Sequence, residues 1–134
     1  MAVKFIVIHC LETPTGRDDR AADVHRWHIE RGFDGIGYHY VIPVSGRTER
    51  GRPEYWTGAH VRGHNFESIG IALAGTDEFN DAQIDDLVDL LYRLKLQHQD
   101  AQIVGHYELD SDKTCPNFDV RKFVKRHLPG VDND

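Results

Sequence analysis

Short apolar runs separated by amphipathic segments divide the chain into predicted strands and helices. Residues 4–10 (KFIVIHC) are apolar on both alternating faces, which is typical of a strand buried on both sides within a parallel or mixed sheet. Residues 68–75 (SIGIALAG) and 103–106 (IVGH) predict two more buried strands, the first of them central in the sheet. Residues 37–46 (GYHYVIPVSG) predict a strand that turns at a Ser-Gly pair and returns as a hairpin.

Three segments carry apolar residues at helical spacing. Residues 20–31 predict a helix that ends before Gly32, and residues 118–127 predict a short final helix. Between them, Asn80 and Gln83 have the spacing of a capping box at the start of a third helix. The predicted core stripe of that helix is Ile84, Leu87, Val88, Leu91 and Leu94. Strands separated by helices of this length predict an α/β fold, a single mixed β-sheet flanked by helices on both sides.

Size and charge exclude several classes of protein. The chain has 134 residues, the usual size of one domain, so we expect a single domain over residues 1–134. A net charge of -6 with scattered Lys and Arg argues against binding to nucleic acid. No apolar run approaches the ~20 residues that span a bilayer, and the N-terminal stretch is too short for a secretory signal. We therefore expect no membrane insertion and synthesis in a cytosol.

Histidine is the residue type that points to chemistry, because nine histidines in 134 residues is unusually many and imidazole is the commonest metal ligand. His9 and His106 both lie where a predicted buried strand ends, and the carboxyl ends of neighbouring strands line the crevice in which ligands bind. Cys115 follows His106 in a polar loop that can fold back. Two imidazoles and a thiolate are good zinc ligands, and three protein ligands with a fourth position open are typical of a catalytic site.

Other interpretations of the same residues stay open on the residues alone. A histidine at a strand end is often a hydrogen-bonded core or rim residue, and a lone Cys115 is often a small buried hydrophobe. A single bridge between Cys10 and Cys115 is also open, although two cysteines do not make a disulfide framework.

Four ordered motifs carry a resemblance to a known family. The segments FIVIHC, VHRWHIERGFDGIGYHYVI, GAHVRGHNFESIGIALAG and GHYELDSDKTCPNFDV extend from Phe5 to Val120. They resemble the successive motifs of zinc-dependent N-acetylmuramoyl-L-alanine amidases, a family that includes peptidoglycan recognition proteins and the small amidase-type phage lysozymes. The resemblance implies one catalytic domain that hydrolyses the amide bond between N-acetylmuramic acid and L-alanine in peptidoglycan.

The resemblance also implies a ligand set and two catalytic residues. One Zn²⁺ per chain would be held by His9, His106 and Cys115, and Tyr38 and Lys113 match the family's two other catalytic positions. Zinc lowers the pKa of bound water from about 15.7 to about 7. The Lys113 ammonium can then stabilise the oxyanion, and the Tyr38 hydroxyl can bind the attacking water or that oxyanion. The alternatives are a solvated loop charge at Lys113 and a sheet aromatic at Tyr38.

One position departs from the family's pattern. Some members carry a glutamate general base in the strand after SIGI, where this chain has Ala72. Either no separate base is needed and Tyr38 orients the water, or another group such as a nearby histidine takes the proton. Tyr38 and Tyr40 alternate and are expected on the same face of the sheet, so they cannot both be catalytic.

A substrate-binding groove is the last implied feature of the site. The family's equivalent loop faces the substrate, so His60, His64 and Asn65 are expected to line the groove. Trp56 lies in a loop where it can stack on a sugar ring, or else is a loop aromatic without a role. The remaining helical histidines are interpreted as surface or packing residues: His25, His28, His98 and His127.

The biological role that we expect is that of a phage endolysin, active as a monomer. It would accumulate in the host cytoplasm without a signal peptide and reach the cell wall after another protein permeabilises the membrane. The alternatives are a cytosolic muropeptide-recycling amidase, a non-catalytic peptidoglycan-binding module, against which Cys115 argues, and a protein that also regulates a phage RNA polymerase. A glycosidase is disfavoured because no carboxylate pair is suitably placed.

Overall fold

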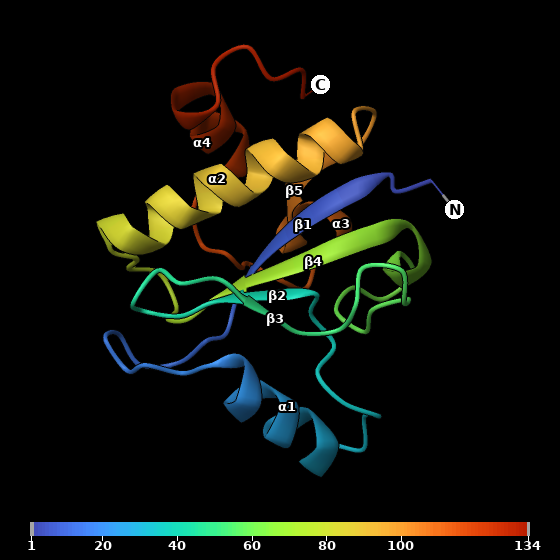
Figure 1. Ribbon diagram of the computed structural model, residues 1–134, viewed down its shortest axis with the longest axis vertical. Helices are drawn as coiled ribbons and strands as arrows, with labels where there is room; N and C mark the ends of the chain where they lie inside the picture. The colour runs from blue at the N-terminus through green and yellow to red at the C-terminus, as the bar shows by residue number, and fades with distance from the viewer. Residues whose placement is uncertain (1, 134) are drawn as a thin grey trace.

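The computed structural model describes residues 2–133 and has a mixed five-stranded sheet with helices on both faces (Figure 1). The strands are β1 (Phe5–Cys10), β2 (Tyr40–Ile42), β3 (Glu49–Arg50), β4 (Ser68–Leu73) and β5 (Gln102–Gly105). Their order is β3-β2-β4-β1-β5, so β4 is the central strand, as predicted. β1 runs parallel to β4 and β5, β2 runs parallel to β4, and β3 pairs with β2 in the predicted antiparallel hairpin.

Helices cover both faces of this sheet, which confirms the predicted fold class. The helical elements are α1 (Ala21–Glu30), the 3-10 turn η1 (Asn65–Glu67), α2 (Asp81–Gln97), α3 (His106–Leu109) and α4 (Val120–His127). α1 lies on one side of the sheet, and α2 and α4 lie on the other (Figure 1). Among the described residues, no helix is long and apolar enough to cross a bilayer.

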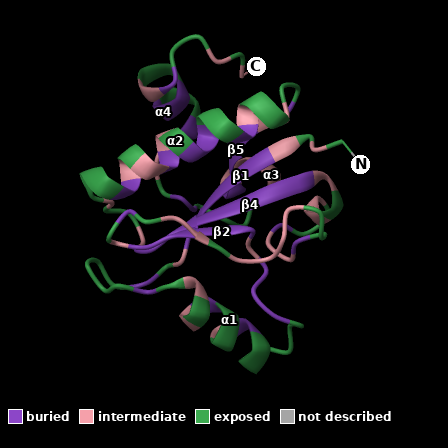
Figure 2. Ribbon diagram, in the orientation of Figure 1, coloured by how far each residue is buried: buried purple, intermediate pink, exposed green. Residues whose placement is uncertain are grey.

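The two faces of the sheet are packed differently. Ile6 and Ile8 belong to the large core cluster that contains the buried residues of α2 and α4, whereas Val7 belongs to a small cluster on the opposite face. Because successive side chains of a strand point to opposite faces, His9 lies on the same face as Val7. The strands are buried throughout the middle of the sheet (Figure 2). Most of the apolar core is therefore under α2, and the thinner packing on the α1 face leaves space for a site.

The start of α2 is built as the sequence predicts. The Asn80 side chain accepts a hydrogen bond from the Gln83 amide (2.8 Å), and the Gln83 side chain accepts one from the Asn80 amide (3.1 Å). The Gln83 amide group also donates to the carbonyls of Ile42 and Ala74, which fastens the helix to the ends of β2 and β4. The core stripe differs slightly from the prediction, because Leu90 is buried as well, while two of its predicted members are partly buried: Ile84 and Val88.

Two local predictions were wrong. Tyr38 and Tyr40 do not share a face, since Tyr40 packs in the large core on the α2 side and Tyr38 packs against the cluster of Val24, Ile36 and Val41 on the α1 side. The regular strand begins only at Tyr40, so its alternation does not extend back to Tyr38. In addition, residues 106–109 form the short helix α3, where the sequence predicted the end of a strand at His106 followed by a loop.

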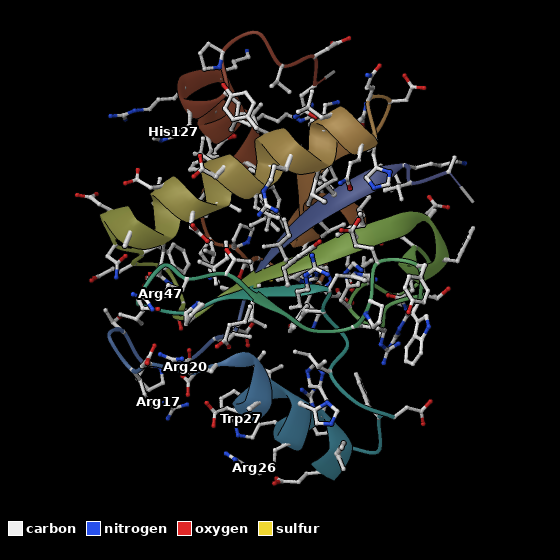
Figure 3. The ribbon with its side chains drawn as sticks, viewed as in Figure 1. Arg17, Arg20, Arg26, Trp27, Arg47 and His127 are labelled. Carbon is white, nitrogen blue, oxygen red and sulfur yellow. The ribbon has the colours of Figure 1, made fainter. Side chains whose placement is uncertain are left out.

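The charged and aromatic side chains labelled in Figure 3 include Arg17, Arg20, Arg26 and Trp27 at or beside α1, and His127 on α4. Arg17, Arg20 and Arg26 each lie within 4 Å of a carboxylate, so their charges are locally compensated. Trp27 is partly buried against the α1-side cluster and lies under the Arg17 guanidinium. His127 stacks on Phe123 of the same helix with ring centroids 4.4 Å apart, which agrees with its interpretation as a surface or packing residue.

Candidate metal centre and cleft

The parallel register of β1 and β5 brings two histidines together. Ile8 pairs with Gly105, the last residue of β5, so His9 and His106 follow at adjacent positions. The two Nδ1 atoms are 3.1 Å apart, and both residues are buried. Strand ends that were recognisable in the sequence thus place these imidazoles side by side.

Cys115 completes a group of three donor atoms. The loop after α3 folds back so that the Tyr107 amide donates to the Cys115 carbonyl (3.2 Å). The Cys115 Sγ then lies 3.5 Å from His106 Nδ1, and the donor atoms of His9, His106 and Cys115 all lie within 4.8 Å of one another. Cys10 and Cys115 are both buried free thiols, so the disulfide interpretation is wrong.

The spacing of these atoms fits zinc. Tetrahedral coordination with Zn–N of about 2.0–2.1 Å and Zn–S of about 2.3 Å separates two nitrogens by about 3.3 Å and a nitrogen from a sulfur by about 3.6 Å. The observed separations are 3.1 Å between the Nδ1 atoms and 3.5 Å between His106 Nδ1 and Cys115 Sγ. The three side chains therefore have both the chemistry and the spacing of a zinc ligand set.

The protonation states in this pocket also suit a metal. Contact with the Cys10 thiol, followed by hydrogen bonds to His106 and His9, holds the pKa of Cys115 far below its ordinary value. The reciprocal contact with Cys115, together with burial, raises the pKa of Cys10, so Cys10 stays a protonated thiol beside a thiolate. Burial lowers the pKa of His9. A thiolate and a neutral imidazole are the forms that bind metal ions.

The three donors lie beside a cleft of about 530 Å³ whose lining includes Tyr38, His60, His106 and Lys113. The Tyr38 ring centroid is 5.0 Å from that of His9. Burial is the main cause that raises the pKa of Tyr38, so its hydroxyl is a hydrogen-bond donor at neutral pH. Lys113 is exposed at the cleft and carries a positive charge near His9. The two predicted catalytic side chains thus lie at the same cleft as the predicted ligands.

The predicted groove residues are distributed over several places. His60 lines the cleft and lies 2.9 Å from His9 Nε2 through its Nδ1. Asn65 also lines it, but its Oδ1 accepts from the amides of His60 and Val61, both at 2.8 Å. His64 is 3.4 Å from Glu67, packs edge-on against Phe5, and is not among the cleft-lining residues of the described chain.

Trp56 lies at a second hollow of about 370 Å³, together with Tyr55 and Phe66. Its side chain is 58% exposed, which leaves a ring face free for stacking. Asn65 lines both hollows, so the second hollow adjoins the cleft.

Sequence reasoning missed part of the cleft lining. His28, Arg31 and Phe33, from the end of α1 and the turn after it, face the same hollow. His28 is buried, and its Nδ1 accepts from the Gly37 amide (2.9 Å), directly before Tyr38. The sequence did contain one indication that they line the cleft, because these residues come shortly before the GYHY motif, which contains Tyr38.

The strand next to β1 supplies no acid. Ala72 pairs with His9 and is fully buried, so its methyl group lies where a carboxylate from β4 would face the donors. This position agrees with the departure noted in the sequence.

Three protein donors beside an open cleft are typical of a catalytic metal site. The N-acetylmuramoyl-L-alanine amidase family model matches residues 1–118, and the chain belongs to this family. It is 32% identical to an endolysin of Klebsiella phage KP32 over 130 residues, which covers 91% of this chain and 85% of the relative. The recognised family is thereby confirmed, and with it a peptidoglycan amidase class of activity.

Solved structures share the fold. The N-acetylmuramoyl-L-alanine amidase LysC from Clostridium intestinale URNW superposes with a TM-score of 0.85 at 27% identity, covering 94% of this chain and 85% of that one. Peptidoglycan recognition protein-LE, solved in complex with tracheal cytotoxin (monomeric diaminopimelic acid-type peptidoglycan), superposes with a TM-score of 0.75 at 26% identity, covering 87% and 75%.

Proposed function

We propose that residues 1–134 form a single catalytic domain that uses zinc to hydrolyse the amide bond between N-acetylmuramic acid and L-alanine of peptidoglycan. The observation that carries this proposal is the convergence of His9, His106 and Cys115 beside a cleft that also contains Tyr38 and Lys113. Membership of the N-acetylmuramoyl-L-alanine amidase family supports this choice of the bond that is hydrolysed.

Zinc bound by these three residues would supply a water of lowered pKa and polarise the scissile carbonyl. The chain itself supplies the charge compensation. Lys113 places an ammonium at the cleft, where it can stabilise negative charge on the carbonyl oxygen, and the Tyr38 hydroxyl can donate a hydrogen bond to the same oxygen. Because Ala72 leaves β4 without a carboxylate, Tyr38 is our candidate for orienting the reacting groups.

The cleft continues toward the hollow at Trp56. We infer that the glycan stacks there, because an exposed indole offers an apolar face that suits a sugar ring. Asn65 and His60 line the inner part of the path, while His64 is the weakest candidate because its ring contacts Glu67 and Phe5.

The biological role that we favour is that of an endolysin, as in the phage relative, acting as a monomer on the wall after the membrane has been permeabilised by another protein. Binding to a phage RNA polymerase stays a prediction, and no surface among the described residues supports it. Muropeptide recycling would use the same site and differs only in the size of the substrate.

The test is hydrolysis of purified cell walls by native, chelator-treated and zinc-reloaded protein, with magnesium reloading as the control. We expect activity to be lost on chelation and restored by zinc alone, with release of new L-alanine amino termini and no new reducing sugar. Undiminished hydrolysis by metal-free protein would refute the zinc mechanism. Zinc-loaded protein that binds walls without cutting them would instead identify a binding module.

A further inference from the structure

The His60 ring connects a predicted metal ligand to the central strand. Its Nδ1 lies 2.9 Å from His9 Nε2, and its Nε2 lies 3.2 Å from Ser68 Oγ. The Ser68 hydroxyl in turn donates to the backbone carbonyl of His64 (2.8 Å). Three hydrogen bonds thus run in sequence from His9 to a backbone oxygen.

The direction of every bond in this sequence is determined by its two ends. His9 Nδ1 faces His106 and Cys115, so a metal-binding His9 has its lone pair on Nδ1 and its proton on Nε2. The Nε2–H of His9 then donates to His60 Nδ1, which requires the His60 proton to be on Nε2. That proton is donated to Ser68 Oγ, and the Ser68 hydroxyl proton goes to a carbonyl, which can only accept. Each group has one donor and one acceptor role, and no role conflicts.

Two glycines leave room for the His60 ring. A Cβ atom added at Gly70 of β4 would lie 2.6 Å from His60 Cγ, and one added at Gly58 would lie 2.7 Å from His60 Cδ2. Both distances are far shorter than van der Waals contact, so these two glycines form a slot for the imidazole. The backbone amide of His60 is held by Asn65 Oδ1 at 2.8 Å. Main chain and side chain are therefore both constrained.

We propose that His60 is a positioning residue of the zinc site, which holds His9 in the Nε2–H tautomer with Nδ1 directed at the metal. The inference rests on the proposed zinc-dependent function and adds a role that differs from contact with substrate. Metal-binding histidines usually give their second N–H to a carboxylate, a backbone carbonyl or water, and loss of such a partner lowers metal affinity about 10- to 100-fold. Here the partner is a neutral imidazole, itself oriented by Ser68.

The first test is zinc affinity, measured by competition with a chromogenic chelator and without any substrate. We expect His60→Ala to weaken zinc binding by about 10- to 100-fold. His60→Asn places an amide oxygen near the position of Nδ1 and should recover part of the affinity. His64→Ala removes a histidine of the same loop that has no bond to a ligand, and it is the matched control, with zinc affinity expected within about twofold of the original protein.

The second test reads the tautomers directly. Long-range ¹H–¹⁵N correlation spectra of the zinc-loaded protein should show His9 and His60 both protonated on Nε2, and His60→Asn should retain the Nε2–H form of His9. Zinc affinity of His60→Ala within about threefold of the original, or a His60 ring protonated on Nδ1, would overturn the proposal.

The proposed function and the positioning role of His60 would be refuted by different results. A protein that binds no zinc at all overturns both the proposed function and the role of His60. A protein that binds zinc with an unchanged affinity in His60→Ala overturns only the latter. If His60→Ala does not fold, Ser68→Ala decides the question, since an unchanged His60 Nε2–H signal and an unchanged zinc affinity in that variant would refute a chain of bonds.

Discussion

The hydrogen bond from the Gly37 amide to His28 makes the Tyr38 side of the cleft sensitive to acid. His28 Nδ1 accepts this bond at 2.9 Å, and the imidazole ring lies 5.5 Å from the Tyr38 ring. An imidazole can accept at Nδ1 only when that nitrogen carries no proton. Burial, followed by the charges of Arg31, Arg52 and His25, lowers the pKa of His28 from 6.5 to about 4.

The sign and size of the effect follow from linkage. As the pH falls below 6.5, His28 becomes protonated in the unfolded chain, whereas in the folded protein it stays neutral down to about pH 4. The free energy of unfolding therefore decreases between pH 6.5 and 4, and His28 causes no change outside this range. A pKa shift of one unit is worth about 1.4 kcal/mol, so the full loss of folding stability is about 3.5 kcal/mol, of which about 2.5 kcal/mol has occurred at pH 4.5. Such a loss is a large fraction of the stability of a domain of this size.

The assay compares the original protein with His28→Asn, whose amide oxygen can accept the Gly37 bond but does not titrate. Free energies of unfolding from urea titrations of metal-free protein at pH 7.5, 5.5 and 4.5 give the difference between the two proteins at each pH. Contributions from the other histidines are common to both and cancel. We expect the difference to move by about 2.5 kcal/mol toward the variant between pH 7.5 and 4.5. A difference that does not change with pH would refute the role of His28.

Two further predictions concern the reaction and the fold. Lys113→Ala and Tyr38→Phe should each lower turnover on cell walls by about a hundredfold or more while zinc content stays at one per chain, because each removes a proposed donor to the developing oxyanion. Normal turnover would exclude that residue from the mechanism. Asn80→Ala should reduce the free energy of unfolding by about 1 kcal/mol in urea titrations, since it removes the N-cap of α2. An unchanged unfolding midpoint would show that the hydrogen bonds from the Gln83 side chain to Ile42 and Ala74 hold the start of α2 without the N-cap.

The closeness of His9 and His106 could be predicted because it depends on strand ends. A buried apolar run is readable in the sequence, and the residue that follows it must lie at the edge of the sheet, so His9 and His106 could be placed near each other before their contact was known. The capping box at Asn80 is another local signal, and it was correct for the same reason. Cys115 needed the resemblance as well, because the path of the loop after His106 includes the short helix α3.

Side-chain partners across the fold could not be predicted. The contact of His60 with His9 joins residues 51 apart through a loop whose path the sequence does not specify. The same limit applies to the Gly37 amide, which bonds to His28 across a turn. The error at Tyr38 has a different cause, because the alternation of a strand was extended two residues beyond the point where β2 begins.

The central strand carries two opposite size limits along one short segment. On one face, Ile69, Ile71 and Leu73 fill the core, so truncation there would leave voids. On the other, Ser68, Gly70 and Ala72 alternate with them, and any bulkier side chain at Gly70 would displace the imidazole above it. In a saturation-mutagenesis map, odd and even positions of this strand should both be intolerant, the odd positions to smaller side chains and the even positions to larger ones. Neighbouring positions of β4 would thus exclude opposite kinds of substitution, one the small side chains and the next the large ones.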